Sequence, residues 1–335
     1  MADLPETMRA HVVEAFGEPE AFVEREIERP DPGPNEVLVE VEATSVNPVD
    51  YKLRGGGGPL APEPPAVLHG DLAGTVAAVG PGVDDFDVGD DVYGCVGGVS
   101  GTSGTLAEYA LADAASLARK PESLSMREAA ALPLVTITAW EGLHDRAAVA
   151  SGDSVLVHGG TGGVGHVAVQ LADAAGATVT ATASTEGKRE TAMEFGARNV
   201  VDYAEPVESY VSEFAPGGFD VVFDTIGSEA DNLETSFSAA APNADVVTTM
   251  SRGEHELTDV HTKGLSFHTV FMLIPLLHDR HDGKRRHGEI LRRAAELADT
   301  GRLEPLLDER FAFDEPAAAH RRAEEGPTGK VTLAR

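Results

Sequence analysis

Cysteine is almost absent from this chain: Cys95 is the single thiol among 335 residues. One thiol excludes intramolecular disulfides and zinc sites built from several thiolates. The roughly 18 uninterrupted apolar residues that a membrane-spanning helix needs are also missing. The N-terminus lacks the basic start and apolar block of a secretory signal. We therefore expect a cytoplasmic protein that neither forms disulfides nor enters a membrane.

Lysine is scarce as well, with six residues in a chain of 26 basic and 56 acidic side chains and a net charge of −30. The acidic residues are spread along the chain, which argues against nucleic acid or an anionic membrane as a partner. Acidic excess with little lysine is typical of proteins from salt-loving organisms, where ~1 M salt shortens the Debye length to about 3 Å. We expect adaptation to high salt and a looser fold below roughly 0.5 M salt. An ordinary acidic protein is the alternative.

Length and hydrophobic patterning predict about two domains of an α/β protein. In the segment VLVEVEATSVN, Val37, Val39 and Val41 alternate with Glu40 and Glu42, as in a half-exposed strand. The first ~110 residues repeat such strands between Gly/Pro turns, so they read as a β-rich unit. Beyond about residue 125, strand-like and helix-like segments alternate, which predicts a doubly wound parallel sheet.

One glycine turn lies where a strand passes into a helix. It follows the strand SVLVH and has the pattern G-x-G-x-x-G at Gly160, Gly162 and Gly165. In a dinucleotide fold the first glycine permits the turn, the second lets the backbone approach a pyrophosphate, and the third brings helix and strand together. A glycine-rich turn without a ligand is the alternative. The predicted cofactor-binding residues of this turn are Gly160, Thr161, Gly162, Gly163, Val164 and Gly165.

The next strand, ATVTATAST, indicates which dinucleotide is bound. Folds that hold NAD place a carboxylate at the end of this strand for the ribose 2′-hydroxyl. Here Ala183 and Ser184 take that place, with Lys188 and Arg189 one helical turn further on. A small residue, a hydroxyl and cations favour the 2′-phosphate of NADPH. Glu186 would restore NAD if it folded back, and a solvated helix face is the alternative for the two cations.

Several motifs in order along the chain resemble the zinc-free quinone oxidoreductase branch of the medium-chain dehydrogenase/reductase superfamily. They are SVNPVDYKLRGG, LHGDLAGTVAAVG, AAALPLVTITAWEGL, VLVHGGTGGVGHVAVQLA and GKVTLAR. The resemblance implies a GroES-like β-barrel catalytic domain at residues 1–134 and 300–335. It also implies a Rossmann NADP-binding domain, with a doubly wound parallel sheet, at residues 135–299.

Departures from the zinc-binding branch predict that no metal is held. The resemblance places Asn47 where that branch has a cysteine ligand, and Gly70-Asp71 where it has a His-Glu pair. The lobe with four cysteines is missing, so a tetrahedral zinc site is not expected. His69 is one residue from the ligand position. His278, His281 and His287 lie in a charged stretch and are expected at the surface.

Without a Lewis acid, the substrate must itself accept hydride readily, as quinones and α,β-unsaturated carbonyls do. The resemblance makes Asn47 the candidate donor and positioner, Asp50 an orienting group and Tyr51 a phenol near the substrate. Some relatives carry a tyrosine one place later, where this chain has Lys52. Each has a structural alternative, namely a turn for Asn47, a helix cap for Asp50 and packing for Tyr51.

The resemblance also implies that Thr138 approaches the nicotinamide and that Tyr203 lies near the 2′-phosphate. Helix packing beside Trp140 is the alternative for Thr138, and an ordinary core or surface aromatic residue is the alternative for Tyr203. Cys95 is expected to be a packed side chain.

We expect a homodimer, because family members often pair through the edge of the nucleotide-domain sheet and residues 245–250 and 266–273 are strand-like. The predicted activity is NADPH-dependent reduction of quinones or enones. An enoyl-thioester reductase and a non-catalytic NADPH-binding or redox-sensing protein are the alternatives.

Overall fold

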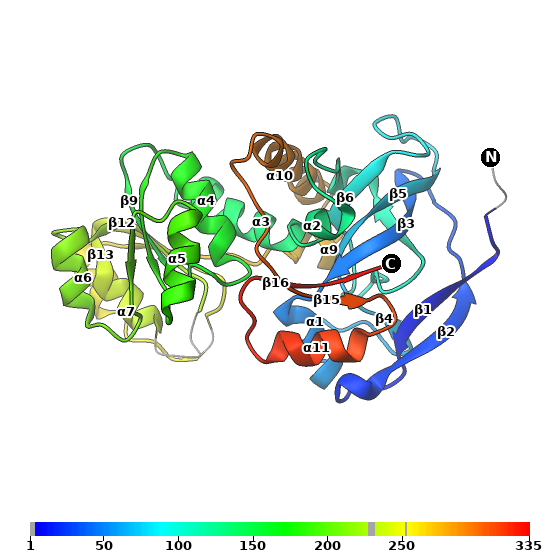
Figure 1. The fold of residues 1–335 in the computed structure, drawn as a ribbon, viewed down its shortest axis with the longest axis horizontal. Coiled ribbons are helices and arrows are strands. Elements are labelled where there is room, and N and C mark those ends of the chain that lie inside the picture. The colour runs from blue at the N-terminus through cyan, green and yellow to red at the C-terminus, as the bar shows by residue number, and fades with distance from the viewer. Residues whose placement is uncertain (1–3, 227–231, 252) are drawn as a thin grey trace. The chain divides into compact units, whose positions relative to one another are not determined.

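The computed structural model describes residues 4–226, 232–251 and 253–335. The chain forms two compact units (Figure 1). The first consists of Met1–Leu134, Leu273–Gly301 and Leu307–Arg335, and the second of Val135–Met272 and Arg302–Leu306. Each unit has its own sheet and its own apolar core.

The first unit is built around a largely antiparallel sheet of seven strands, ordered β15-β16-β3-β5-β6-β8 with β7 on β3. A smaller sheet has the order β2-β1-β4. The valines of β3 are fully buried and Glu40 and Glu42 are exposed, so the predicted alternation is confirmed. The strands are β1 (Thr7–Val13), β2 (Phe22–Glu28), β3 (Glu36–Ser45), β4 (Ala66–Val67), β5 (Asp71–Val79), β6 (Asp91–Cys95), β7 (Tyr109–Asp113), β8 (Leu117–Arg119), β15 (Leu307–Ala312) and β16 (Lys330–Ala334).

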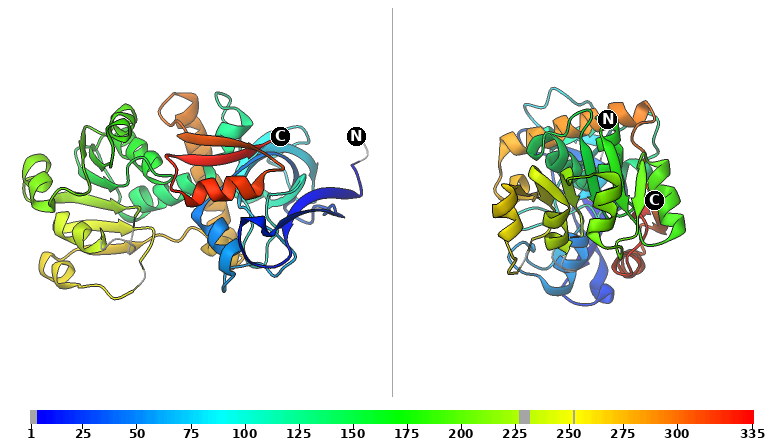
Figure 2. Two further views of the ribbon diagram at one scale, coloured as in Figure 1. Left: turned by 60° about the horizontal axis from the view of Figure 1, so that its bottom comes forward. Right: turned by 90° about the vertical axis from the view of Figure 1, so that its left-hand side faces the viewer.

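Helices pack against this sheet, and α11 lies beside the C-terminal strand β16, as the left view of Figure 2 shows. They are α1 (Pro48–Gly56), α2 (Met126–Ala130), α9 (Ile274–Leu277), α10 (His281–Asp299) and α11 (Pro316–Glu324), with short 3₁₀ turns η1 (Pro19–Ala21) and η2 (Ala114–Ser116). Helix α3 (Pro133–Trp140) begins in the first unit and continues into the second.

Helix α10 belongs to the first unit, although the domain boundary expected from the sequence placed it in the second. The cause is close packing on η2 and β8. A Cβ on Gly288 would lie 2.3 Å from the Ala115 carbonyl oxygen, and the Tyr93 hydroxyl donates to the Leu291 carbonyl at 2.6 Å. This packing also buries His287, which was expected at the surface, whereas His278 and His281 are exposed.

The second unit is a parallel sheet of six strands in the order β11-β10-β9-β12-β13-β14, which confirms the predicted doubly wound arrangement. The order reverses between β9 and β12, and ligands of such sheets bind at the carboxyl ends of the strands there. The strands are β9 (Ser154–His158), β10 (Thr178–Thr182), β11 (Asn199–Val201), β12 (Phe219–Asp224), β13 (Ala240–Thr248) and β14 (Ser266–Thr269).

One face of this sheet carries a large apolar cluster. Leu156, Val222 and Val246 from neighbouring strands pack with Tyr210 and Phe237 from the covering helices. The helical segments are η3 (Glu141–Arg146), a π-helical turn, and α4 (Gly165–Ala174), α5 (Glu186–Glu194), α6 (Val207–Phe214), α7 (Asn232–Ala239) and α8 (Thr258–Lys263).

Candidate functional site

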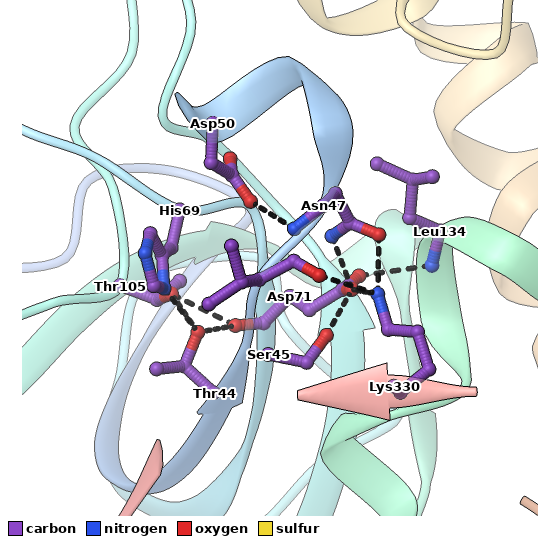
Figure 3. A network of polar contacts seen from close by, with 10 residues as sticks. Thr44, Ser45, Asn47, Asp50, His69, Asp71, Thr105, Leu134 and Lys330 are labelled. Atoms are coloured by element: carbon purple, nitrogen blue, oxygen red, sulfur yellow. Dashed lines mark hydrogen bonds and ion pairs between the residues drawn. The ribbon is translucent and has the colours of Figure 1, made fainter. Parts of the chain in front are cut away.

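A buried polar network centred on Asp71 lies at one end of the first unit's sheet (Figure 3). Asp71 is fully buried. Its Oδ2 accepts hydrogen bonds from Ser45 Oγ and Asn47 Nδ2, each at 2.7 Å. Its Oδ1 accepts from the backbone N–H of Leu134 at 2.9 Å. Lys330 Nζ stands 3.7 Å from Oδ2.

Strand order brings these distant residues together. Strand β3 lies between β5 and β16, so the end of β3, the start of β5 and the start of β16 meet. Asp71 and Lys330 are the first residues of β5 and β16. Asn47 lies two residues beyond the end of β3 and is the N-cap residue of α1. Leu134 is in the first turn of α3, so Asp71 also holds the beginning of that helix.

Lys330 is a buried cation with three acceptors. Its Nζ donates to the Val46 carbonyl at 3.1 Å and to Asn47 Oδ1, and it pairs with the Asp71 carboxylate. Burial lowers the pKa of Lys330, and the charges of Asp71 and Asp50 oppose that shift. The ammonium is thus compensated inside the protein, as a buried charge has to be.

The three candidate catalytic residues lie close in sequence but in different surroundings. Asn47 is buried, with both ends of its amide bonded to Lys330 and Asp71. Asp50 accepts from the Asn47 backbone N–H at 2.7 Å, a helix-capping contact, and burial raises the pKa of Asp50 to about 7. Tyr51 is half-buried and packs against an apolar cluster that contains Val46 and Leu106.

His69 and His320 form a second polar contact beside the network, which the sequence analysis did not predict. Both are fully buried, and their Nε2 atoms are 2.8 Å apart. His69 Nδ1 is 3.3 Å from Thr44 Oγ1, which donates its own hydrogen to the Asp71 carbonyl at 2.7 Å. Of two Nε2 atoms at this distance, one has to donate and the other to accept, so the two rings are not both protonated.

In the second unit, the glycine turn leads from β9 into α4 as predicted. A Cβ on Gly165 would lie 2.0 Å from the Gly159 carbonyl oxygen, and one on Gly160 would lie 2.7 Å from the Ala181 Cβ. These two glycines are required by packing between strand and helix. A Cβ on Gly162 would meet only the Gly159 carbonyl oxygen, at 3.3 Å. At 3.3 Å the turn would have to shift by a few tenths of an ångström to admit that Cβ, so packing restricts position 162 less than the other two. A pyrophosphate approaching the backbone would restrict it further. The turn therefore fits a dinucleotide.

The end of β10 has an exposed hydroxyl and nearby cations. Ser184 is exposed, and Lys188 is half-buried in the first turn of α5. Arg189 forms an ion pair with Asp202 at 3.3 Å, so its guanidinium is already shared with a carboxylate. Tyr203, just after β11, is 63% exposed. Parallel strands end at the same edge, so these residues gather at the carboxyl edge of the sheet.

Comparisons with known proteins agree with both units. Residues 33–122 match the family described as alcohol dehydrogenase GroES-like domain, and residues 163–274 match the family described as zinc-binding dehydrogenase. The chain is 32% identical to the quinone oxidoreductase of Homo sapiens over 99% of both chains. It is 33% identical to the 2-methylene-furan-3-one reductase of Solanum lycopersicum, over 98% of this chain and 80% of that one.

Solved structures give the same result. An alcohol dehydrogenase superfamily protein from Novosphingobium aromaticivorans superposes with a TM-score of 0.93 at 44% identity, covering 98% of this chain and 100% of that one. The chain belongs to the quinone oxidoreductase branch of the medium-chain dehydrogenase/reductase superfamily. Its first unit is the GroES-like domain of that superfamily and its second is the Rossmann domain, as the sequence motifs predicted. A quinone oxidoreductase from Pseudomonas syringae superposes with a TM-score of 0.84 at 28% identity, covering 98% and 100% of the two chains.

The superfamily includes zinc enzymes, but the donor set of this member does not suit zinc. Position 47 supplies an amide, and Asp71 is already engaged by a lysine ammonium and three hydrogen bonds. A dication placed there would be repelled by Lys330. Among the described residues, no group of three or more His, Cys, Asp or Glu side chains is arranged to hold a metal ion.

The structure also shows where Thr138 and Cys95 lie. Thr138 is buried in α3, two residues before Trp140. Cys95 is fully buried, and burial raises the pKa of its thiol, so its predicted packing role is confirmed. Of the helices in the described ranges, none is long and apolar enough to cross a bilayer.

The histidine pair predicts that the fold is sensitive to acid. Burial lowers the pKa of His69 and of His320, the latter to about 3. The unfolded chain, with imidazole pKa values of ~6.5, takes up protons first. The pair's stabilisation is therefore complete above pH ~6.5 and is lost as the pH falls from there toward ~3, by up to ~1.4 kcal/mol per imidazole and pH unit. We expect H320Q to make the loss of Tm between about pH 7 and about pH 5 smaller, because one buried imidazole fewer resists protonation. Part of the loss should remain, since burial also lowers the pKa of His11 and His158. H278Q, at an exposed histidine, should keep the wild-type slope, and an unchanged slope in H320Q would contradict this account.

The three glycines of the turn predict different effects of alanine. G165A should prevent folding, because its Cβ would overlap the Gly159 carbonyl. G162A should still fold, with a loss of stability of about 1 kcal/mol because its Cβ crowds the Gly159 carbonyl oxygen. It should bind NADPH at least about tenfold more weakly, equivalent to ~1.4 kcal/mol. Thermal unfolding and fluorescence titration with NADPH measure these effects. G55A is the control, since a Cβ on Gly55 in α1 meets nothing within 4 Å. Wild-type NADPH affinity in G162A would refute a cofactor role for the turn.

Proposed function

We propose that this protein is a zinc-independent, NADPH-dependent reductase that transfers a hydride to quinones or α,β-unsaturated carbonyls in a high-salt cytoplasm. The observation that carries this proposal is the binding of the Lys330 ammonium by Asn47 and Asp71, at the positions that the zinc branch uses for its metal. The names of the relatives support the substrate class, since they include quinone oxidoreductases and a furanone reductase.

The chemistry follows from a conjugated acceptor. NADPH supplies the hydride, and the negative charge passes to the carbonyl oxygen of the quinone or enone. The protein's part is to orient the acceptor and to place a hydrogen-bond donor at that oxygen. An amide nitrogen carries two hydrogens, and Asn47 uses one on Asp71. We assign the other to the acceptor oxygen. Asp50 holds the Asn47 backbone, and the packed Tyr51 shapes the surroundings.

For the cofactor, we assign the pyrophosphate to the turn that contains Thr161, Gly163 and Val164 as well as the three motif glycines. The 2′-phosphate is assigned to Ser184 and Lys188, with Tyr203 beside it. Thr138 is assigned to the nicotinamide. The exposed hydroxyl at the end of β10 is what favours NADPH over NADH.

A turnover assay tests the proposal. The protein is mixed in roughly 1 M KCl, which screens its acidic surface, with NADPH or NADH and a panel of quinones, enones and enoyl thioesters. Absorbance of the reduced nicotinamide is followed. We expect oxidation of NADPH with quinones or enones, slower oxidation of NADH, and loss of rate below roughly 0.5 M salt. Binding of NADPH without turnover of any acceptor would instead support a redox-sensing protein.

A substitution at the end of β10 sharpens the test of coenzyme choice. S184D should raise KM for NADPH at least about tenfold, because a carboxylate repels the 2′-phosphate. S209D is the matched control, since Ser209 is also exposed but lies on α6. If S184D and S209D behave alike, Ser184 does not face the 2′-phosphate.

We also propose a homodimer formed through β14, the last strand in the order of the second unit's sheet. An unpaired strand edge readily accepts a second strand, and Phe271 close to it is 44% exposed. Light scattering should give twice the 35.0 kDa of one chain. F271D should weaken the dimer, whereas V88D, at an exposed valine of the first unit, should not. A monomer at every concentration would contradict the proposal.

A further inference from the structure

Lys330 does more than balance the charge of Asp71. The hydrogen bonds that Lys330 and Asp71 can form also restrict the orientation of the Asn47 amide. An ammonium only donates hydrogen bonds and a carboxylate only accepts them. The Asn47 amide lies between the two, with Oδ1 at Lys330 Nζ and Nδ2 at 2.7 Å from Asp71 Oδ2. Figure 3 shows the amide meeting both charged groups.

Only one orientation of this amide satisfies both neighbours. Rotating it by half a turn would point N–H groups at the ammonium and the carbonyl oxygen at the carboxylate. Two hydrogen bonds to buried charges would become two repulsive contacts. The ion pair therefore fixes where the second N–H of Asn47 points, which the NPVD motif alone does not do.

Lys330 also stands beside the carboxylate on which the network is built. Asp71 accepts from Ser45, Asn47 and the Leu134 backbone. Lys330 Nζ, 3.7 Å from Oδ2, is the cation that compensates this fully buried carboxylate. Without it, the carboxylate would remain as an uncompensated buried charge among these contacts.

We infer that Lys330 is a positioning residue of the reductase: it fixes the amide of Asn47 so that its second N–H faces the carbonyl oxygen of the acceptor. This inference rests on the proposed function. Lys330 acts through Asn47 and need not touch the substrate itself.

The test uses a variant in which both charges are removed. K330M alone leaves a buried carboxylate uncompensated and is expected to unfold readily. In K330M/D71N, the new amide can donate or accept, so either orientation of Asn47 is satisfied. We expect Tm to recover toward wild type and the Kd for NADPH to stay within about twofold, while kcat with the best acceptor falls at least about tenfold. Recovery of kcat together with Tm would show a merely structural role and overturn the inference.

The matched control is K263M/D259N, which removes a half-exposed Lys–Asp pair with an N–O distance of 3.6 Å on α8. It should change neither kcat nor KM. Because it removes the same two charges, it separates the effect of the buried pair from a general change of net charge.

A second measurement needs no turnover. In ¹H–¹⁵N spectra, the side-chain amide of Asn47, assigned by its loss in N47D, should give one pair of signals in wild type and two pairs, or broadened ones, in K330M/D71N. A single unshifted pair in the double variant would overturn the inference. If wild type reduces no acceptor, the proposed function fails, and the amide spectra still test the orientation by Lys330.

Discussion

The arrangement of the first unit's site depends on one buried ion pair, Lys330 with Asp71. Both side chains are withdrawn from water, and desolvation of two charges is costly unless hydrogen bonds complete their coordination. Here they do, because Ser45, Asn47 and the Leu134 backbone supply donors and the Val46 carbonyl supplies an acceptor. Apolar residues of equal volume would fill the space, but they would not orient an amide or hold the first turn of α3.

The features that were predicted correctly are those that a short segment of the sequence encodes by itself. The alternation of Val37, Val39 and Val41 is a property of one strand, and the glycine turn is a property of one strand–helix junction, so each is visible in a short segment. The doubly wound order follows from the repeated alternation of strand and helix.

Non-local packing explains what could not be predicted. Lys330 meets Asn47 and Asp71 only because β16 pairs with β3, and a lone lysine in GKVTLAR carries no sign of that pairing. The contact between His69 and His320 joins residues 251 positions apart. Helix α10 follows the second unit's last strand in sequence, yet it packs on β8 and η2, and no local signal distinguishes these two surfaces.

The three glycines of the motif are required for different reasons. The structure distinguishes these reasons, whereas the sequence pattern does not. Gly160 and Gly165 are fixed by contacts inside the chain, since a Cβ on either would overlap neighbouring atoms. A fold without any ligand would need them as well, so they are weak indicators of a cofactor. A Cβ on Gly162 would meet a single atom, the Gly159 carbonyl oxygen, at 3.3 Å, so packing restricts this position less than the other two. Of the three glycines, Gly162 is therefore the one for which a bound dinucleotide would add most to the requirement.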